Sequence, residues 1–241
     1  MPQNEEKIEI KTASKVIPIT IVRSSRAKRI ALKSRPHKGD IALILPHDQP
    51  LSRGITFAQS KEKWLLSILE KMHYLAIPLI PDAVIPIRGV EHRLLSLSTI
   101  RGQVEALYRP GDDIPILKIP GGEAHFERRL KDWLYQEAKY DISEAVRFYA
   151  QKAGVKIHGI TIRDTRSRWG SCSSQGRLNF SWRLIMAPPF VLRYLCAHEV
   201  AHRKEMNHSS HFWNVVRSLD PDYKKAEIWL KQNGSQLHMI G

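Results

Sequence analysis

The sequence predicts an α+β fold in which short strands dominate the first half and long helices dominate the second. Residues 17–21 alternate isoleucine with polar or small residues, which is typical of a half-buried strand. Over residues 123–153, by contrast, apolar residues recur at helical spacing. A Pro-Gly-Gly run at residues 120–122 separates the two patterns. We therefore expect a β-rich N-terminal region with one helix at residues 1–120 and a second domain at residues 121–241.

The composition is that of a basic globular protein. The chain has 241 residues, 42% of them hydrophobic, and a formal net charge of +14. Its two cysteines, Cys172 and Cys196, are too few for a disulfide scaffold or a zinc site built from four thiolates. The first residues are polar, without the apolar core of a secretory signal, and no apolar run is long enough to cross a membrane. We expect a soluble, cytoplasmic protein.

The first 120 residues divide into one helix and several short strands. Residues 1–14 are polar, and we expect them to be loosely structured. Apolar residues between Phe57 and Leu75 recur at helical spacing and predict a helix over residues 53–75. Gly39-Asp40 and Pro110-Gly111 are typical turn dipeptides. The predicted strands are residues 17–21, 30–32, 41–45, 84–87, 93–97, 104–108 and 114–119.

A basic segment, residues 23–38, lies within the β-rich region. A polyanion such as nucleic acid is one interpretation of its charge, and the solvated face of a basic protein is the other. No aromatic residue is interleaved, which argues against single-strand binding by base stacking. Nucleic acid is therefore a candidate partner that the sequence neither requires nor excludes. The segment has no acidic residue, and its seven basic residues are Arg23, Arg26, Lys28, Arg29, Lys33, Arg35 and Lys38.

The second half is predicted to consist of helices around a short sheet. One long helix has an apolar stripe formed by Phe126, Leu130, Trp133, Ala138, Ile142, Val146 and Tyr149. Glycine after that stripe and proline before a later one are the usual end and start signals of helices. The elements expected are a helix over 123–153 that Gly154 closes, a strand over 157–165, a loop containing Gly170, a strand over 177–184, a helix beginning at Pro188-Pro189 and a last helix from Asp220-Pro221 to Lys231.

The stretch that carries chemistry is H-E-x-x-H at His198, Glu199 and His202. On a helix, residues four apart share a face, so two imidazoles at this spacing can bind one zinc ion. Glu199 can reach a water on the open side of the metal and act as general base. The outer nitrogens of the histidines need acceptors, for which Glu205, Asp164 and backbone carbonyls are candidates. The motif predicts a peptidase with one zinc ion per chain.

His208 is the predicted third ligand. Asn207 tolerates the left-handed conformation that ends helices, so a helix ending there can turn His208 back toward the metal. Ser209 or Ser210 is then expected to cap a second helix. His211 is the alternative ligand, but it would already lie in that second helix. Three histidines leave the open position that catalysis needs.

These motifs resemble those of a known family. Arg168-Trp-Gly-Ser-Cys172, the run from Asn179 to Leu184 and the stretch from His198 to Trp213 are similar to the YgjP-like metallopeptidases, bacterial relatives of the SprT-like and WLM zincins. The resemblance is dense over residues 168–213 and weaker over the remaining chain. It implies a zincin-like metallopeptidase domain at the C-terminus, with the same three zinc histidines and the same glutamate base. It implies no particular substrate beyond protein or peptide.

Other site residues stay open at this point. Hydrolysis develops an oxyanion that needs a further donor, and His211, Arg168 and Tyr194 are candidates for that role or for substrate binding. A peptide substrate also needs an edge strand to pair with, expected near Arg177–Asn179 or in the loop before it.

Three alternative functions remain. A non-catalytic, zinc-stabilised nucleic-acid-binding protein would keep the histidines but have no use for Glu199, whose presence favours an enzyme. Zinc hydrolysis of a non-peptide amide or ester would use the same residues. The SprT-like and WLM relatives include peptidases that act on protein crosslinked to DNA, so the resemblance adds a DNA-associated protease.

Overall fold

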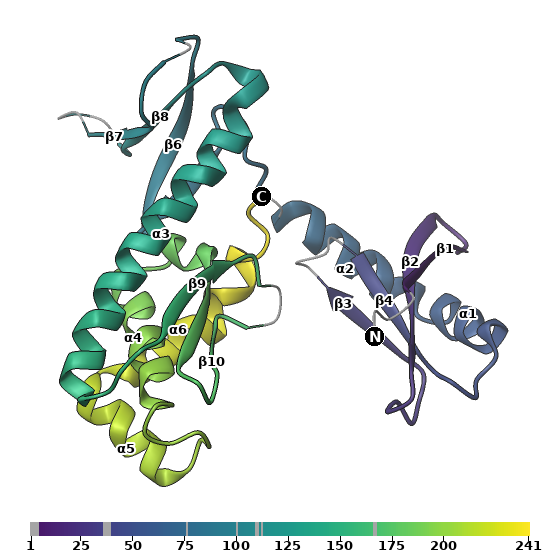
Figure 1. Cartoon of the computed structure of the whole chain (residues 1–241). Coiled ribbons are helices and arrows are strands. Elements are labelled where there is room, and N and C mark those ends of the chain that lie inside the picture. Colours follow the sequence, from purple (N-terminus) through teal and green to yellow (C-terminus); the bar gives the residue numbers. More distant parts are fainter. Residues whose placement is uncertain are drawn as a thin grey trace. The chain divides into compact units, whose positions relative to one another are not determined.

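The computed structural model describes residues 5–35, 40–75, 77–99, 101–108, 111, 113–165 and 168–241, with the backbone alone for residues 5 and 71–75 (Figure 1). Helices and small sheets alternate along these residues, so the predicted α+β class is confirmed. The chain divides into two compact units, Met1–Ala76 and Ile77–Gly241. Among the described helices, none combines the length and the apolar character needed to span a bilayer. Four features used above lie outside the description, namely Lys38, Gly39, Pro110 and the side chain of Leu75.

The first unit is built on a four-stranded sheet in the order β1-β2-β4-β3. Strands β2 and β4 are parallel, and the other neighbours are antiparallel. The first strand corrects the expectation that residues 1–14 are loose, because Ile8 and Ile10 alternate with charged residues and pair with Ile19 and Ile17. The strands are β1 (Glu5–Lys11), β2 (Val16–Ser24), β3 (Ala31–Arg35) and β4 (Asp40–Pro46).

Two helices follow this sheet where the sequence predicts one. The predicted helix is interrupted at Ser60, whose hydroxyl donates to the carbonyl of Phe57 over 2.7 Å. The first helix lies close to β4 because Gly54 has no side chain; a Cβ there would lie 2.9 Å from Cδ2 of Leu43. The helices are α1 (Leu51–Gln59) and α2 (Glu62–Leu75).

The described part of the basic segment contains two kinds of residue. Arg23 donates to the carbonyl of Gln49 over 2.5 Å. Arg35 is buried, and its Nε donates to Oδ1 of Asp40 over 2.7 Å. These two arginines support the fold, so the polyanion interpretation rests on the exposed residues, which are Arg26, Lys28, Arg29 and Lys33.

The second unit begins with another four-stranded sheet, in the order β5-β6-β8-β7. Its buried residues Ile85, Leu94 and Leu117 belong to the same hydrophobic core as the helices that follow. The boundary expected at residue 120 therefore falls inside this unit, because the apolar face of the sheet is covered by residues on the far side of the turn at 120–122. The strands are β5 (Val84–Ile87), β6 (Val90–Leu97), β7 (Glu105–Leu107) and β8 (Ile116–Pro120).

Helix α3 (Glu123–Ala153) is the longest element and has the extent that the sequence predicts (Figure 1). It ends at Gly154, which adopts the left-handed conformation with a φ of 66°. Leu134, rather than the predicted Trp133, continues the buried stripe at a spacing of four residues. The buried residues of the helix are Phe126, Leu130, Leu134, Ala138, Ile142, Val146, Tyr149 and Ala153.

A three-stranded sheet and three α-helices complete the second unit. The sheet has the order β10-β11-β9, with β11 antiparallel to β10 and parallel to β9. Cys196, which is buried and free, joins α4 to α3, because its Sγ lies 3.9 Å from the carbonyl oxygen of Ile142. The elements are β9 (Gly159–Arg163), β10 (Gly170–Cys172), β11 (Arg177–Ser181), the 3₁₀ helix η2 (Trp182–Met186), α4 (Pro189–Ala201), α5 (Ser210–Leu219) and α6 (Tyr223–Leu237).

Candidate metal centre

Helix α4 carries the H-E-x-x-H motif at its C-terminal end. The helix stops at Ala201, with His202 as its C-cap residue at φ −61° and ψ −16°. The end expected at Asn207 is therefore not observed, and Asn207 is not among the residues with positive φ. The chain turns back earlier, because the N–H of Glu205 donates to the carbonyl of Ala201 over 3.1 Å.

This turn brings His208 against His198 and His202. The candidate ligand atoms of the three histidines lie within 4.8 Å of one another. The Nε2 atoms of His198 and His208 are 3.0 Å apart. Among the described residues this is the one group of three histidine, cysteine or acidic side chains close enough to hold a metal ion, and His211 is not part of it. His211 lies exposed on α5, where Ser209 is the N-cap and accepts from the N–H of Phe212 over 3.3 Å.

The ring of Phe212 packs against all three imidazoles. It is fully buried, and its ring centroid lies 4.8 Å from that of His198, 4.6 Å from that of His202 and 4.7 Å from that of His208. Phe212 follows His208 by four residues in the sequence, which gives no sign that one ring contacts all three histidines. Packing against a buried ring limits the rotamers that the imidazoles can adopt.

Hydrogen bonds to Nδ1 of His198 and His202 determine which ring nitrogen faces the point where the three imidazoles meet. Nδ1 of His202 lies 3.1 Å from the backbone carbonyl of Glu205, one of the acceptors that the sequence suggests. Nδ1 of His198 lies 3.4 Å from the hydroxyl of Tyr194, which is buried one turn earlier on α4. With Nδ1 occupied by a hydrogen bond, Nε2 is left free to bind a metal.

The electrostatics of the site suit a cation. Burial, with smaller contributions from His202 and His208, lowers the pKa of His198 to about 3. Burial also lowers the pKa of His202. Both imidazoles are therefore neutral at neutral pH and can each present a lone pair. Three imidazoles that converge on one point fit a zinc ion with an open fourth position.

Glu199 is buried beside the histidines and touches strand β10. A Cβ built on Gly170 would lie 2.6 Å from Oε1 of Glu199, so only glycine leaves room for the carboxylate. Burial raises the pKa of Glu199 to about 8, although the positive charge of Arg168 opposes this rise. The sequence predicts only a loop at Gly170 and no role for it, and the signal that could have indicated one is its place in the Arg-Trp-Gly-Ser-Cys motif at residues 168–172.

A pocket of about 390 Å³ opens above the histidines, and Glu199, Arg168, Met206 and residues 170–172 line it with them. Strand β11 forms the middle of the sheet and is paired on both sides, whereas β10 has a single described neighbour. Of the two places expected to receive a substrate strand, residues 177–179 are thus paired on both sides. In the segment before them, β10 has one edge that no strand of the described residues pairs with.

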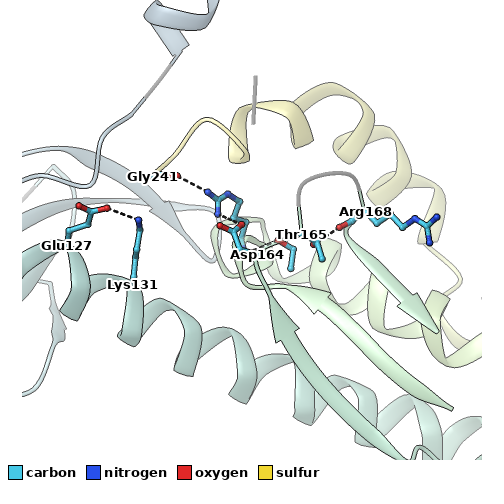
Figure 2. A network of polar contacts seen from close by, with 8 residues as sticks. Glu127, Lys131, Asp164, Thr165, Arg168 and Gly241 are labelled. Atoms are coloured by element: carbon cyan, nitrogen blue, oxygen red, sulfur yellow. Dashed lines mark hydrogen bonds and ion pairs between the residues drawn. The ribbon is translucent and has the colours of Figure 1, made fainter. Parts of the chain in front are cut away.

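Arg168 is held at the pocket through its backbone. Its carbonyl accepts a hydrogen bond from the hydroxyl of Thr165 over 2.6 Å (Figure 2). The neighbouring Asp164 accepts from Arg183 over 2.9 Å, and Arg183 also donates to the carbonyl of Gly241 over 2.8 Å. Asp164, a candidate acceptor for a zinc histidine, is therefore engaged with Arg183 instead.

The family model of the YgjP-like metallopeptidase domain matches residues 28–233. The chain belongs to the YgjP-like metallopeptidase family. The predicted resemblance is confirmed, and so is the prediction that the protein is a metallopeptidase. The matched region of this YgjP-like protein extends into both compact units.

A solved structure, the metallopeptidase zymogen of Pyrococcus abyssi abylysin, is similar to this YgjP-like chain at 21% identity and a TM-score of 0.34, over 37% of this chain and 93% of that one. No protein with a curated description matches the sequence.

Proposed function

We propose that the protein is a zinc-dependent peptidase in which His198, His202 and His208 hold one zinc ion and Glu199 is the general base. The observation that supports this most directly is the meeting of four side chains in one pocket. The ligand atoms of three imidazoles converge within 4.8 Å, and a buried carboxylate lies beside them. A purely structural zinc site would have no need of that carboxylate, so the arrangement favours a hydrolase over a zinc-stabilised binding protein.

Zinc and the surrounding side chains would have different roles in hydrolysis. When bound, zinc supplies a Lewis acid that acidifies a coordinated water and polarises the scissile carbonyl. The positive charge of a bound zinc ion would lower the pKa of Glu199, so that its carboxylate would accept the proton of the attacking water and return it to the leaving amine. Gly170 leaves the space in which this carboxylate lies, and Phe212 keeps the imidazoles turned toward the common point.

The substrate is a protein or peptide that lies along β10. The free edge of β10 borders the pocket and can pair with an extended backbone. Arg168, at the same pocket, would bind the substrate or its developing oxyanion. The helix α4 with the H-E-x-x-H motif, the edge strand β10 and the long helix α3 would together make residues 121–241 a zincin-like peptidase domain. The sheet of β5 to β8 would support this domain through the hydrophobic core that they share.

Metal analysis coupled to activity tests this proposal. Protein purified without chelator should carry about one zinc ion per chain, cleave an unfolded protein substrate, lose activity with chelator and regain it with zinc. A double His198→Ala and His202→Ala variant should lose both zinc and cleavage. The matched control replaces two exposed histidines, His47 and His125, and should keep both. Zinc retained by the first double variant, or cleavage by metal-free protein, would refute the assignment.

A further inference from the structure

We infer that Arg203, the residue directly after the second histidine of H-E-x-x-H, is a positioning residue for substrate binding. It acts through the hairpin of β10 and β11 and fixes the edge of β10 at the pocket relative to the metal centre. This inference rests on the proposed function, because that edge is where the substrate backbone is proposed to pair. Arg203 is not one of the described residues that line the pocket, so its effect on a substrate must be indirect.

The side chain of Arg203 joins the end of the metal helix to the turn of the hairpin. Its Nη1 donates to the carbonyl of Ser174 over 2.9 Å, within the turn that connects β10 to β11. Its Nε donates to the carbonyl of Lys156 over 3.3 Å, shortly before β9. A guanidinium presents its donors in a rigid plane, so one side chain can hold both carbonyls in fixed positions. Arg203 thereby links the metal-binding segment to two parts of the sheet.

Gly176 allows the guanidinium to lie close to this turn. It has a φ of 76°, in the left-handed region that favours glycine. A Cβ built on Gly176 would lie 2.8 Å from Nε and 2.9 Å from Cζ of Arg203. A side chain at residue 176 would therefore displace the guanidinium from its two carbonyls, so the turn and the arginine depend on each other.

Two contacts hold β10 against the metal-binding segment, one at each end of the strand. At its first residue, Gly170 lies against the carboxylate of Glu199. Beyond its last residue, Ser174 is held by Arg203. The two side chains that make these contacts lie on either side of His202 in the sequence. The position of the substrate edge relative to this metal ligand is therefore set at both ends of β10.

The turn keeps other support when Arg203 is replaced. The N–H of His158 donates to the carbonyl of Gly176 over 2.9 Å, and Nδ1 of His158 lies 2.8 Å from the carbonyl oxygen of Gln175. These contacts join the turn to the segment before β9 and not to α4. Without Arg203 the hairpin should therefore stay folded, while its position relative to the metal centre becomes less fixed.

Substrate binding by inactive protein tests this role. In the Glu199→Gln background, Arg203→Met keeps a long side chain but removes its donors. The Kd for a fluorescently labelled unfolded protein should rise by roughly tenfold, the effect of losing one hydrogen bond to a charged group. In the active protein KM should rise by a similar factor while kcat is unchanged, because pairing with β10 is made equally in the bound substrate and in the transition state. Zinc affinity, measured by chelator competition, should also be unchanged.

Two further variants at arginines sharpen the test. Arg203→Lys should recover part of the lost affinity, because its ammonium can still donate to one of the two carbonyls. Arg129→Met is the matched control. Arg129 likewise donates to a backbone carbonyl, that of Gly102 over 2.6 Å, and its Cδ lies 2.9 Å from a Cβ built on Gly121. Because Arg129 does not contact the hairpin, its replacement should leave Kd and KM as in the parent protein.

The close contact at Gly176 provides an independent route to the same defect. Gly176→Ala should raise Kd as Arg203→Met does, and the double variant should bind no more weakly than the weaker of the two single variants. Gly154→Ala is the control for backbone strain, because Gly154 has a φ of 66° but nothing within 4 Å of the added Cβ. Its Kd should match that of the parent.

The outcomes separate this inference from the proposed function. If Arg203→Met binds the labelled protein as tightly as its parent, or if Arg129→Met weakens binding equally, the inference is overturned while the proposed function stands. Weaker zinc binding by Arg203→Met would overturn it as well, because the effect would then lie at the metal. If the wild-type protein neither binds nor cleaves the unfolded protein, the proposed function fails and this inference fails with it.

Discussion

Glu62 and Glu199 are the same side chain in opposite surroundings. Glu62, partly exposed at the start of α2, accepts from the hydroxyl of Ser14 over 2.5 Å and from its N–H over 3.0 Å. These hydrogen bonds lower its pKa to about 2. Burial instead raises the pKa of Glu199 to about 8. The surroundings, and not the residue type, therefore set the direction in which the pKa of each carboxyl shifts.

The largest expected effect is that of Glu199→Gln. Glutamine fits the same space but cannot accept a proton, so cleavage of an unfolded protein should fall by at least about 10²-fold. Zinc content and melting temperature should match those of the wild type. The same replacement at Glu62 should leave cleavage unchanged. Equal activity of Glu199→Gln and wild type would exclude Glu199 as the base.

The second contrast is between His208 and His211. Since His208 lies with the other two histidines and His211 does not, His208→Ala should weaken zinc binding by more than the roughly 10–100-fold expected for an outer partner. His211→Ala should retain wild-type affinity in the same chelator competition. The reverse order would make His211 the third ligand.

A smaller effect is expected from Gly170→Ala, which would place a methyl group 2.6 Å from Oε1 of Glu199. Overpacking of this kind costs about 1–3 kcal/mol of stability. Because the added methyl group displaces the general base from its position, the catalytic rate should fall by roughly tenfold while zinc is retained. Gly159→Ala in β9 is the control, because nothing lies within 4 Å of the added Cβ there. Normal activity of Gly170→Ala would show that Glu199 has room to move.

The smallest effect concerns Glu62, which fixes the turn at Ser14. Glu62→Gln should reduce the hydrogen-exchange protection of the Ala13 and Ser14 amides, both of which donate to this carboxylate. Because the folded pKa of about 2 lies below the ordinary value of 4.5, the stabilisation is present above pH 4.5 and is lost as the pH falls toward 2. The difference from wild type should therefore shrink over that range. Glu70→Gln, further along α2, should show no such difference.

Local patterns in the sequence were enough for much of this structure. The stripe of α3 and its end at Gly154 follow from helical periodicity and glycine stereochemistry. The meeting of His198, His202 and His208 follows from spacing, although the turn forms at Ala201 and without the left-handed Asn207 that the sequence suggested.

What the sequence could not supply depends on contacts between distant residues. The break at Ser60 lies inside a helical pattern that continues across it. The unit boundary at residue 76 depends on how β5 to β8 share a core with α3, which no local signal reports. The contact of Gly170 with Glu199 joins segments that are 29 residues apart in the chain.

Helix α3 has 31 residues, so at 1.5 Å per residue it extends about 46 Å. Near its end, Lys152 donates to the carbonyl of Leu219 after α5, and along its middle Asp141 pairs with Arg88 from the turn between β5 and β6. Elements from both ends of the second unit therefore contact this one continuous helix. Local unfolding of this helix would expose the hydrophobic core to solvent. The backbone amides of α3 should therefore exchange hydrogen only when the whole unit unfolds. Residues 77–241 should accordingly unfold as a single cooperative block, from which the metal-binding half cannot be cut away intact.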